Sequence, residues 1–548
     1  MQILPAIGAI ALVLACLYAV STWTRKRRAR PLGARLLPGP RGIPFLGPFW
    51  KIPAEGAWIQ WCKWAKQYGP IYQVELMGVT HIFVTKESIA RELLAKRAAI
   101  YSDRPAVPSV VNSKSSVAHG DGAGEYMPFM GKNGQYSPSA SPASRANAAV
   151  EFWKRQRKFA HGILSAANRE HFNHYPDLES RRFIHDMLQN PANYTQVIEN
   201  FTSRVMSRLV WANAKHADDL QQSAWDLLVQ MSPAGPITNR LTPLLLLPQW
   251  LSPWMRKEKK RHDGQQEWFM KLRREIGEEV AEKRALPSFM KSYFDTRDRH
   301  QFQDDKEAAY AVGMLGIAGV FTIGSPLHTF LLCMVLFPQW LKPIQQEMDR
   351  ELGPDRPPEI GDFAKLPMLR AVIMEAVRWR PAVPTGVGHE VEQDDVYDGY
   401  FIPKGATVHP VEWAYSRDPA VYHEPDEFNP MRWLEPGSPV YREPLTKYPT
   451  IQNHSLFGYG RRACLGQDLT EHILFVGCGA LAWATNIRKK RDAAGREIPV
   501  PDNSYNSLLI IRPHAFEFEL EARSDKHLKI VQDRFSEIPQ LDPHVGAE

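Results

Sequence analysis

The sequence predicts a mainly α-helical fold with small β-sheets, and three observations support this prediction. The chain has 548 residues, of which 44% are hydrophobic, so it can bury a large core. Segments 363–380 and 469–485 carry apolar residues at three- and four-residue spacing, which is typical of helices. Segment 71–85 alternates apolar and polar residues around Gly78, which predicts a hairpin, and 515–523 repeats that alternation. We therefore expect a helical body with small sheets at its periphery.

The distribution of charge argues against a nucleic-acid partner. The net charge is +7, but five basic residues between positions 25 and 30 account for most of it. A nucleic-acid binder would spread its basic residues over a binding face. The five cysteines are scattered without close pairs, so the sequence indicates neither a disulfide framework nor a zinc knuckle. A reducing compartment agrees with this pattern.

The N-terminal region predicts a membrane anchor, which we assign to residues 1–24. Residues 3–23 contain no charged side chain, and 21 helical residues would span about 31 Å, roughly one hydrocarbon core. The alternative is a cleaved signal peptide, but such a peptide carries its basic residues before a shorter apolar run. Because the basic cluster follows the apolar run, we expect a lumenal N-terminus and a cytoplasmic body, on a single-pass protein of the endoplasmic reticulum.

Two boundaries complete the predicted domain organisation. Residues 25–48 form a basic and Pro-rich linker, and residues 49–548 form the catalytic domain. Within that domain, 131–151 is rich in Ser, Ala, Pro and Gly and has few large apolar residues. This composition predicts a disordered surface insertion, and an unspliced stretch in the gene model is the alternative.

A lone cysteine, Cys464, lies in the decapeptide 457–466, FGYGRRACLG. A cysteine without Cys or His neighbours cannot complete a zinc site, but it can be the only protein ligand of a haem, since the porphyrin supplies four nitrogens. The three glycines of this segment would let the backbone approach a macrocycle closely, and Arg462 offers a cation to a haem propionate. The alternative is a buried structural cysteine, which is the usual interpretation of an isolated Cys.

The decapeptide fits the pattern Phe-x-x-Gly-x-Arg-x-Cys-x-Gly, with Phe457, Gly460, Arg462, Cys464 and Gly466 in place. It resembles the cytochrome P450 family of haem-thiolate monooxygenases, and further motifs follow in that family's order along nearly all of the chain after the predicted anchor. The resemblance implies the cytochrome P450 fold, here preceded by a single N-terminal transmembrane helix. It also implies haem b (iron protoporphyrin IX), with Cys464 as the axial thiolate and metal ligand.

Two further motifs are similar to the family's helical elements. EAVR supplies Glu375 and Arg378, which lie on one helix face, and FNPMRW supplies Arg432. The resemblance implies a buried network of these three residues that braces the haem pocket. Taken alone, such a helical pair is usually a solvated surface contact.

The segment WKRQR matches the family's Trp-x-x-x-Arg, so the resemblance implies that Trp153 and Arg157 contact a haem propionate. The alternative is a basic, solvated helix face. We expect the other basic side chains of this segment to face water or an acidic electron donor, and they are Lys154, Arg155 and Lys158.

The apolar segment 313–332 is similar to the family's long helix over the haem, but it departs from the oxygen-binding motif. Ala318, Gly319 and Thr322 match that motif, and Thr322 is the expected catalytic residue, whereas Phe321 replaces the usual acid. We expect protons to arrive through water or another group, and Pro326 would free the Thr322 carbonyl to hold such a water. The alternative is that Phe321 simply packs against substrate or core.

A second departure follows the bracing helix. The chain has His389 and Glu390 where similar sequences often read His-Arg, and we expect His389 to contact a propionate in place of the missing arginine. A lone histidine is more often structural than functional.

The predicted function is that of a membrane-anchored monooxygenase that oxidises, and most simply hydroxylates, a small apolar organic molecule with O2. The segment 397–419 is similar to the corresponding region of filamentous-fungal members of the family that act in secondary metabolism. Since no dinucleotide-binding motif is visible, electrons would come from a NADPH-dependent cytochrome P450 reductase. One alternative is a haem-thiolate enzyme of oxidative coupling, dehydration or rearrangement without oxygen insertion. The other is a non-catalytic haem-binding sensor.

Overall fold

The computed structural model describes Cys16 and residues 31–43, 45–107, 109–110, 125–131, 142–165, 172, 174–241, 244 and 251–542. Apart from Cys16, the predicted anchor 1–24 lies outside the described residues, as does the basic cluster that follows it.

Helices form most of the described part of the chain, as predicted. They are α2 (Ala57–Tyr68), α3 (Glu87–Ala90), α4 (Pro142–Ile163), α6 (His174–Gln189), α7 (Tyr194–Trp211), α8 (Ala217–Met231), α9 (Pro253–Ala281), α10 (Phe289–Asp295), α11 (Arg297–His300), α12 (Asp305–Leu336), α13 (Leu341–Leu352), α14 (Pro367–Trp379), α15 (Glu412–Tyr415), α16 (Gln467–Ala484), α17 (Asp525–Ser536) and α18 (Ile538–Leu541).

Three small sheets lie beside this helical body. The largest has the order β2 (Ile71–Leu76), β3 (Val79–Val84), β7 (Thr407–Pro410), β4 (His389–Glu390). The second is β1 (Arg35–Leu36), β6 (Tyr400–Ile402), β5 (Asp395–Tyr397), and the third pairs β8 (Thr485–Lys489) with β9 (Phe518–Ala522).

The hairpin and the C-terminal strand predicted from the sequence are confirmed. β2 and β3 are antiparallel with Leu76 opposite Val79, and Gly78 sits in the turn with a φ of +76°, which only glycine adopts without strain. The strand predicted in 515–523 is β9.

The end of the predicted linker belongs to the folded body. Arg35 and Leu36 of β1 pair in parallel with β6, and the amide of Gln73 donates to the Pro38 carbonyl over 2.9 Å. Part of the predicted linker therefore packs on the folded body, with one strand in the second sheet and one hydrogen bond to β2.

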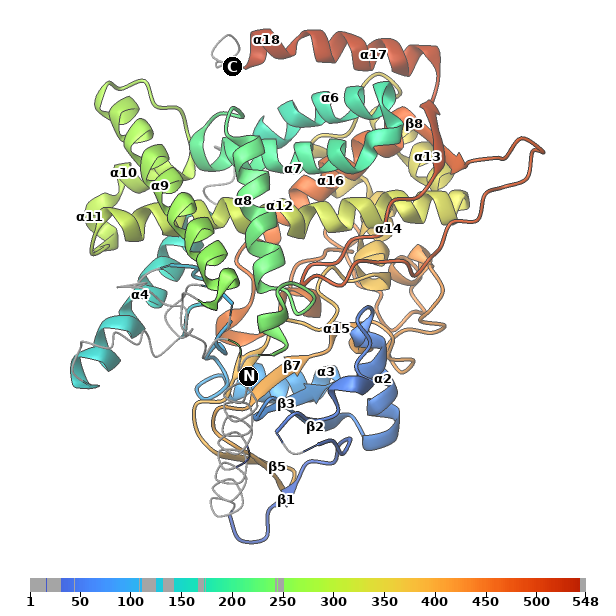
Figure 1. The fold of residues 1–548 in the computed structure, drawn as a ribbon. Coiled ribbons are helices and arrows are strands. Elements are labelled where there is room, and N and C mark those ends of the chain that lie inside the picture. The colour runs from blue at the N-terminus through green and yellow to red at the C-terminus, as the bar shows by residue number, and fades with distance from the viewer. Residues whose placement is uncertain are drawn as a thin grey trace, which may run out of the picture.

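Helix α12 runs through the middle of the molecule, with α6 and α7 on one side and the β2 and β3 sheet at the far end of the other (Figure 1). Small residues bring its neighbours close: a Cβ on Gly319 would lie 2.5 Å from the Met206 sulfur of α7. Among the described helices, α12 is the one long and apolar enough to cross a membrane, but 78% of its apolar window is buried inside the protein. We interpret it as the core helix of the fold.

The predicted insertion 131–151 overlaps the start of α4. The helix begins at Pro142, while 132–141 lies outside the described residues. Proline is favoured in the first turn of a helix, and the alanines that follow are the best helix formers. Composition that predicts disorder is therefore also compatible with a helix in the second half of this segment.

Candidate functional site

The loop that holds Cys464 is fixed by its own backbone. The amide of Cys464 donates to the Phe457 carbonyl over 2.8 Å, and the amide of Gly466 points at the Cys464 sulfur over 3.4 Å. Helix α16 begins at Gln467, so its positive N-terminal end lies beside the thiol. The sulfur is accessible at the surface of this loop, but protein surrounds it on the other sides and this burial raises the pKa of the thiol, against the opposing effects of the Gly466 amide and Arg157.

Gly460 is held by a close contact within the protein. Its φ is +57°, and an added Cβ would lie 2.3 Å from the Leu94 carbonyl oxygen. The close packing of the loop on the helical turn Arg91–Lys96 therefore requires glycine here, and its approach to a macrocycle stays a prediction.

Three arginines gather on one side of Cys464. Arg462 is buried and donates from Nε to the Ser102 carbonyl and from Nη2 to the Met130 carbonyl, each over 2.7 Å. Its Nη1 is buried without a hydrogen-bond partner among the described residues. Arg157 of α4 donates to the Ala463 carbonyl over 2.7 Å, and the Arg462 guanidinium lies 4.2 Å from the centre of the Trp153 ring.

The third arginine, Arg104, was not predicted from the sequence. It is buried and donates to the carbonyls of Pro128, Val387 and Gly388. Burial and the charge of Arg157 lower the pKa of Arg104 to about 10, and burial and the charge of Arg104 lower the pKa of Arg462 to about 8. Arg104 and Arg462 are thus buried guanidinium groups, and the nearby carboxylates of Asp103 and Glu392 partly offset their charge.

Glu375, Arg378 and Arg432 meet in the buried network that the family resemblance implies. Arg378 donates from Nε and Nη2 to Glu375, each over 2.8 Å, and Arg432 Nε donates over 3.1 Å. The Trp433 indole and the Asn429 amide complete the shell of the carboxylate. Glu375 and Arg378 are fully buried, so they do not form the solvated pair that was the alternative.

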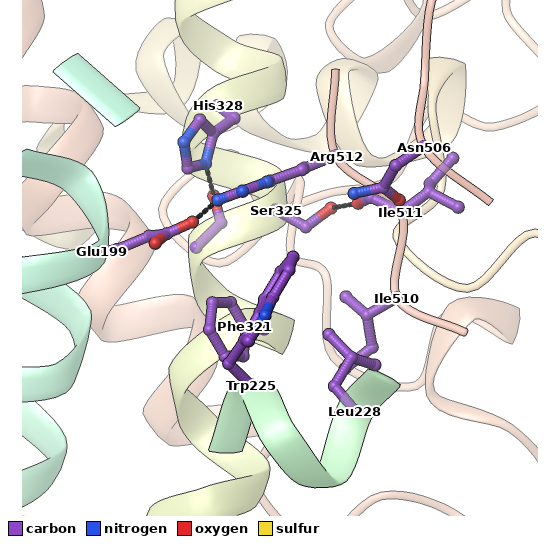
Figure 2. Close-up of a pocket in the computed structure, with 11 residues that line it drawn as sticks. Glu199, Trp225, Leu228, Phe321, Ser325, His328, Asn506, Ile510, Ile511 and Arg512 are labelled. Atoms are coloured by element: carbon purple, nitrogen blue, oxygen red, sulfur yellow. Dashed lines mark hydrogen bonds and ion pairs between the residues drawn. The ribbon is translucent and has the colours of Figure 1, made fainter. Parts of the chain in front are cut away.

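The opposite wall of the site is α12. Ala318 is exposed and Thr322 is half-buried, whereas Phe321 is buried and packs edge-on against Trp225, with ring centres 5.6 Å apart. The Thr322 hydroxyl donates to the Ala318 carbonyl over 2.5 Å, and α12 continues as a helix through Pro326. Phe321 thus packs against Trp225 of α8 (Figure 2), and the water near Thr322 stays a prediction.

One prediction for the basic segment at α4 is wrong. Arg155 does not face water, because its guanidinium pairs with the buried Glu307 of α12 over 2.9 Å. Lys154 and Lys158 are exposed, as expected. Glu307 lies 152 residues further along the chain, so no local spacing predicts this pair.

Comparison with known proteins decides the family. Residues 123–481 match the family model described as Cytochrome P450. The chain belongs to the cytochrome P450 family. This P450 is 31% identical to cytochrome P450 monooxygenase claR of Ampulloclitocybe clavipes, over 94% of the chain and 90% of the relative. It is 32% identical to cytochrome P450 monooxygenase psoD of Aspergillus fumigatus, over 90% and 92%.

A solved structure supports the fold of this P450. A zebra fish cytochrome P450 in a structure with abiraterone superposes with a TM-score of 0.63 at 20% identity, covering 85% of this chain and 100% of that chain. The P450 is accordingly an oxidoreductase with the mostly helical fold and small sheets predicted above, and its relatives are named monooxygenases.

The P450 family implies a haem with thiolate ligation, and the arginine cluster fits such a group. Propionate carboxylates are suited to guanidinium groups, and one of them would give the buried Nη1 of Arg462 an acceptor. Arg157 lies close enough to Cys464 to oppose the rise in the pKa of its thiol, so the arginines that would hold the propionates and the cysteine that would hold the iron belong to one site.

His389 fits the propionate role less well than Arg104 does. Its Nδ1 lies 2.7 Å from the Tyr101 carbonyl and so carries the proton, which makes Nε2 an acceptor in the neutral ring. Burial and the charge of Arg104 hold the pKa of His389 well below its usual range. A neutral acceptor does not bind a carboxylate, so Arg104 is the better candidate, although its segment carries no motif by which sequence reasoning could have found it.

Proposed function

We propose that this P450 hydroxylates a small apolar organic molecule, using O2 and two electrons, and that it binds haem b through Cys464. When bound, the haem iron supplies oxygen activation, and the protein supplies ligand, pocket and proton path. The observation that carries the proposal is the accessible, amide-supported sulfur of Cys464 two residues from the buried Arg462, whose Nη1 has no hydrogen-bond partner among the described residues.

The residues of the site have separate roles in this proposal. Cys464 is the thiolate ligand, and Phe457, Gly460 and Gly466 hold its loop in place. Arg462, Arg157, Trp153 and Arg104 bind the propionates, with His389 packed behind them. The network of Glu375, Arg378 and Arg432 fixes the segment ahead of the loop, since a buried carboxylate with all its acceptor positions used holds one geometry.

Thr322 is the residue proposed to act in catalysis. Its hydroxyl lies on the accessible face of α12 and can exchange its bond to the Ala318 carbonyl for one to a water or substrate group. It would thereby hold the proton donor that a neighbouring acid holds in other members, because Phe321 offers no proton.

The proposed partners are a NADPH-dependent cytochrome P450 reductase, O2 and a membrane. The uncharged segment 3–23 followed by basic residues supports a single-pass anchor in the endoplasmic reticulum with the catalytic domain in the cytoplasm. Similarity to fungal monooxygenases supports an intermediate of secondary metabolism as the substrate.

One observation favours a second candidate function. With Phe321 packed on Trp225 in place of an acid, oxidative coupling, dehydration or rearrangement would lose less from the missing proton donor than hydroxylation would.

Labelled dioxygen distinguishes the two candidates. The substrate is first identified by comparing metabolites of strains with and without the gene, and the full-length protein is then reconstituted with reductase and NADPH. Hydroxylation places one labelled oxygen atom in the product. An oxidised product free of label would overturn hydroxylation in favour of the second candidate.

A further inference from the structure

A short buried turn, residues 125–131, supplies backbone acceptors to the arginine cluster. The carbonyl of Pro128 accepts from Nε of Arg104 over 3.1 Å. The carbonyl of Met130 accepts from Nη2 of Arg462 over 2.7 Å. Since the Ser102 carbonyl holds Nε of Arg462, the plane of this guanidinium is fixed and its Nη1 points in one direction. The turn therefore helps to aim a group that we assign to a propionate.

The turn begins with an unusual backbone conformation. Tyr126 has a φ of +54°, in the left-handed region that a bulky side chain rarely adopts, and it is buried. Its carbonyl accepts from the amides of Phe129 and Met130, over 2.8 and 3.0 Å. Such a conformation persists only where the surrounding structure imposes it, and residues of this kind cluster at functional sites. The contacts of Tyr126 and of its neighbour Glu125 therefore decide the shape of the turn.

Helix α9 provides most of these contacts. The Tyr126 hydroxyl accepts from Nη2 of Arg261 over 2.8 Å. One carboxylate oxygen of Glu125, whose side chain is 1% exposed, lies 2.8 Å from Nε2 of His262. The other accepts from Nζ of Lys306, at the start of α12, over 3.2 Å. A buried carboxylate with two such partners holds one geometry, so the turn is tied to both helices.

The contact between Glu125 and His262 is an ion pair. The Nδ1 of His262 lies 3.1 Å from a carboxylate oxygen of Asp263, while its Nε2 faces Glu125. Because an ionised carboxylate only accepts hydrogen bonds, both ring nitrogens have to donate, and only the imidazolium form can do this. Burial opposes the charge, but the hydrogen bond to Glu125 raises the pKa of His262 above its usual value. A charged pair of this kind is stronger than a neutral hydrogen bond.

We propose that Glu125 and His262 are positioning residues for the haem: they hold the turn on α9, and the carbonyls of the turn hold Arg104 and Arg462 toward the propionates. This inference rests on the proposed function, because it takes these two arginines as propionate ligands. The effect passes from α9 to the cofactor through hydrogen bonds alone. It joins residues that are far apart in the sequence, since His262 follows Glu125 by 137 residues.

The test measures how fast the full-length holoprotein transfers haem to excess apomyoglobin, followed by absorbance. His262→Ala removes the ion pair, whereas His262→Gln keeps a donor to Glu125, because the glutamine amide can take the place of Nε2. Arg273→Ala is the matched control. Arg273 is a buried cation of the same helix, but it pairs with Asp305 of α12 and packs on α10 rather than on the turn.

The positioning role predicts that His262→Ala transfers haem about tenfold faster than the unmodified protein, because the loss of a charge-assisted bond is of this order. His262→Gln should stay within about threefold of the unmodified rate, and Arg273→Ala within about twofold. An equal acceleration in Arg273→Ala and His262→Ala would indicate a general loosening of α9 and would overturn the role. A rate in His262→Gln as high as in His262→Ala would also contradict it.

A double variant shows whether the effect passes through Arg462. In the Arg462→Ala background, His262→Ala should accelerate transfer by less than about threefold, since one of the two guanidinium groups that the turn aims is already absent. A full tenfold effect in that background would refute the connection.

Glu125→Gln keeps the test decisive if His262→Ala does not fold. It preserves the size of the side chain and removes the charge, so transfer should be about threefold faster. An unchanged rate in Glu125→Gln, with Arg462→Ala accelerated, refutes the positioning role and leaves the propionate site intact. An unchanged rate in Arg462→Ala itself refutes the propionate site, and the positioning role with it.

Discussion

The two walls of the candidate site are held by different forces. On the cysteine side, the Glu375 carboxylate accepts from two arginines, an indole and a backbone amide, and the Cys464 loop is tied to Phe457 and Gly466. On the α12 side, the hydroxyl of Thr322 returns to its own helix, and Phe321 is held only by packing. The family's motif is complete on the first wall and altered on the second. The comparison indicates that buried hydrogen bonds constrain the geometry around Cys464. On the α12 side, where packing holds the residues, the sequence can depart from the family's motif.

The largest expected effect is the loss of unfolding free energy in the variant Glu375→Ala. It leaves two buried guanidinium groups without their carboxylate, and breaking such a buried pair costs about 3–5 kcal/mol. Urea unfolding of the purified protein should show this loss together with loss of haem. Glu519→Ala removes a carboxylate from the exposed Arg488 pair and should cost below about 1 kcal/mol. Similar losses in both variants would contradict the difference between buried and exposed networks.

A smaller effect is expected from Arg462→Ala. The variant removes one of three cations that we assign to the propionates, of which Arg104 and Arg462 are buried, and charge-assisted bonds of this kind are worth about 1.5–3 kcal/mol. Haem should transfer to excess apomyoglobin about 10–100 times faster than from the unmodified protein. Its exposed neighbour provides the control, since Arg461→Ala should not change the transfer rate. An unchanged rate in Arg462→Ala would remove Arg462 from the propionate site.

A substitution on the α12 side of the site should change the reaction much more than it changes the stability of the fold. Thr322→Ala removes a half-buried hydroxyl that is bonded within its own helix, so the free energy of unfolding should change by less than about 1 kcal/mol. With reductase, NADPH and substrate, the fraction of electrons released as hydrogen peroxide should rise several-fold, about threefold or more. Thr322→Ser should restore the original fraction, because it keeps the hydroxyl. An unaltered fraction in Thr322→Ala would place the proton donor elsewhere.

The smallest expected effect is a change in thermal stability on substitution of Glu412. The carboxylate of Glu412 accepts a hydrogen bond from the hydroxyl of Ser455, which lies ahead of the cysteine loop, over 2.6 Å. Burial raises the pKa of Glu412 from 4.5 to about 8, so the folded protein keeps a proton that the unfolded chain releases above about pH 4.5. Stability from this group is therefore full below pH 4.5 and falls as the pH rises toward 8. Glu412→Gln should raise the Tm by a few degrees, roughly 2–4 °C, at pH 8 and leave it unchanged at pH 4. A gain that is equal at both pH values would contradict this assignment.

Elements with strong periodicity could be predicted from the sequence. The hairpin β2–β3 follows from the alternation of apolar and polar residues, and the helices α14, α16 and α12 follow from long apolar stretches, because most residues of these helices are buried. The decapeptide around Cys464 could be recognised for a related reason, since a single ligand loop is local in sequence and its glycines and arginine keep fixed spacing.

What the sequence did not reveal depends on contacts between distant segments. Arg104 reaches the site from a segment that shares no spacing with the Cys464 loop, and Arg155 pairs with Glu307 across the fold. The helical start of α4 within 131–151 was missed because the same Ser- and Ala-rich composition suits both a polar helix and a disordered loop. The role of Gly460 became visible only when the packing of Leu94 against it was known.

The central claim is that Cys464 is the thiolate ligand of a haem. It is tested most directly by the carbon-monoxide difference spectrum of the dithionite-reduced protein, recorded for the unmodified chain and for Cys464→Ser. The unmodified protein should show the red-shifted absorption band of thiolate-ligated haem, and the serine variant should lose that band while far-ultraviolet circular dichroism shows an unchanged helical content. A serine variant with the same band as the unmodified protein, or an unmodified protein that binds no haem, would contradict the claim.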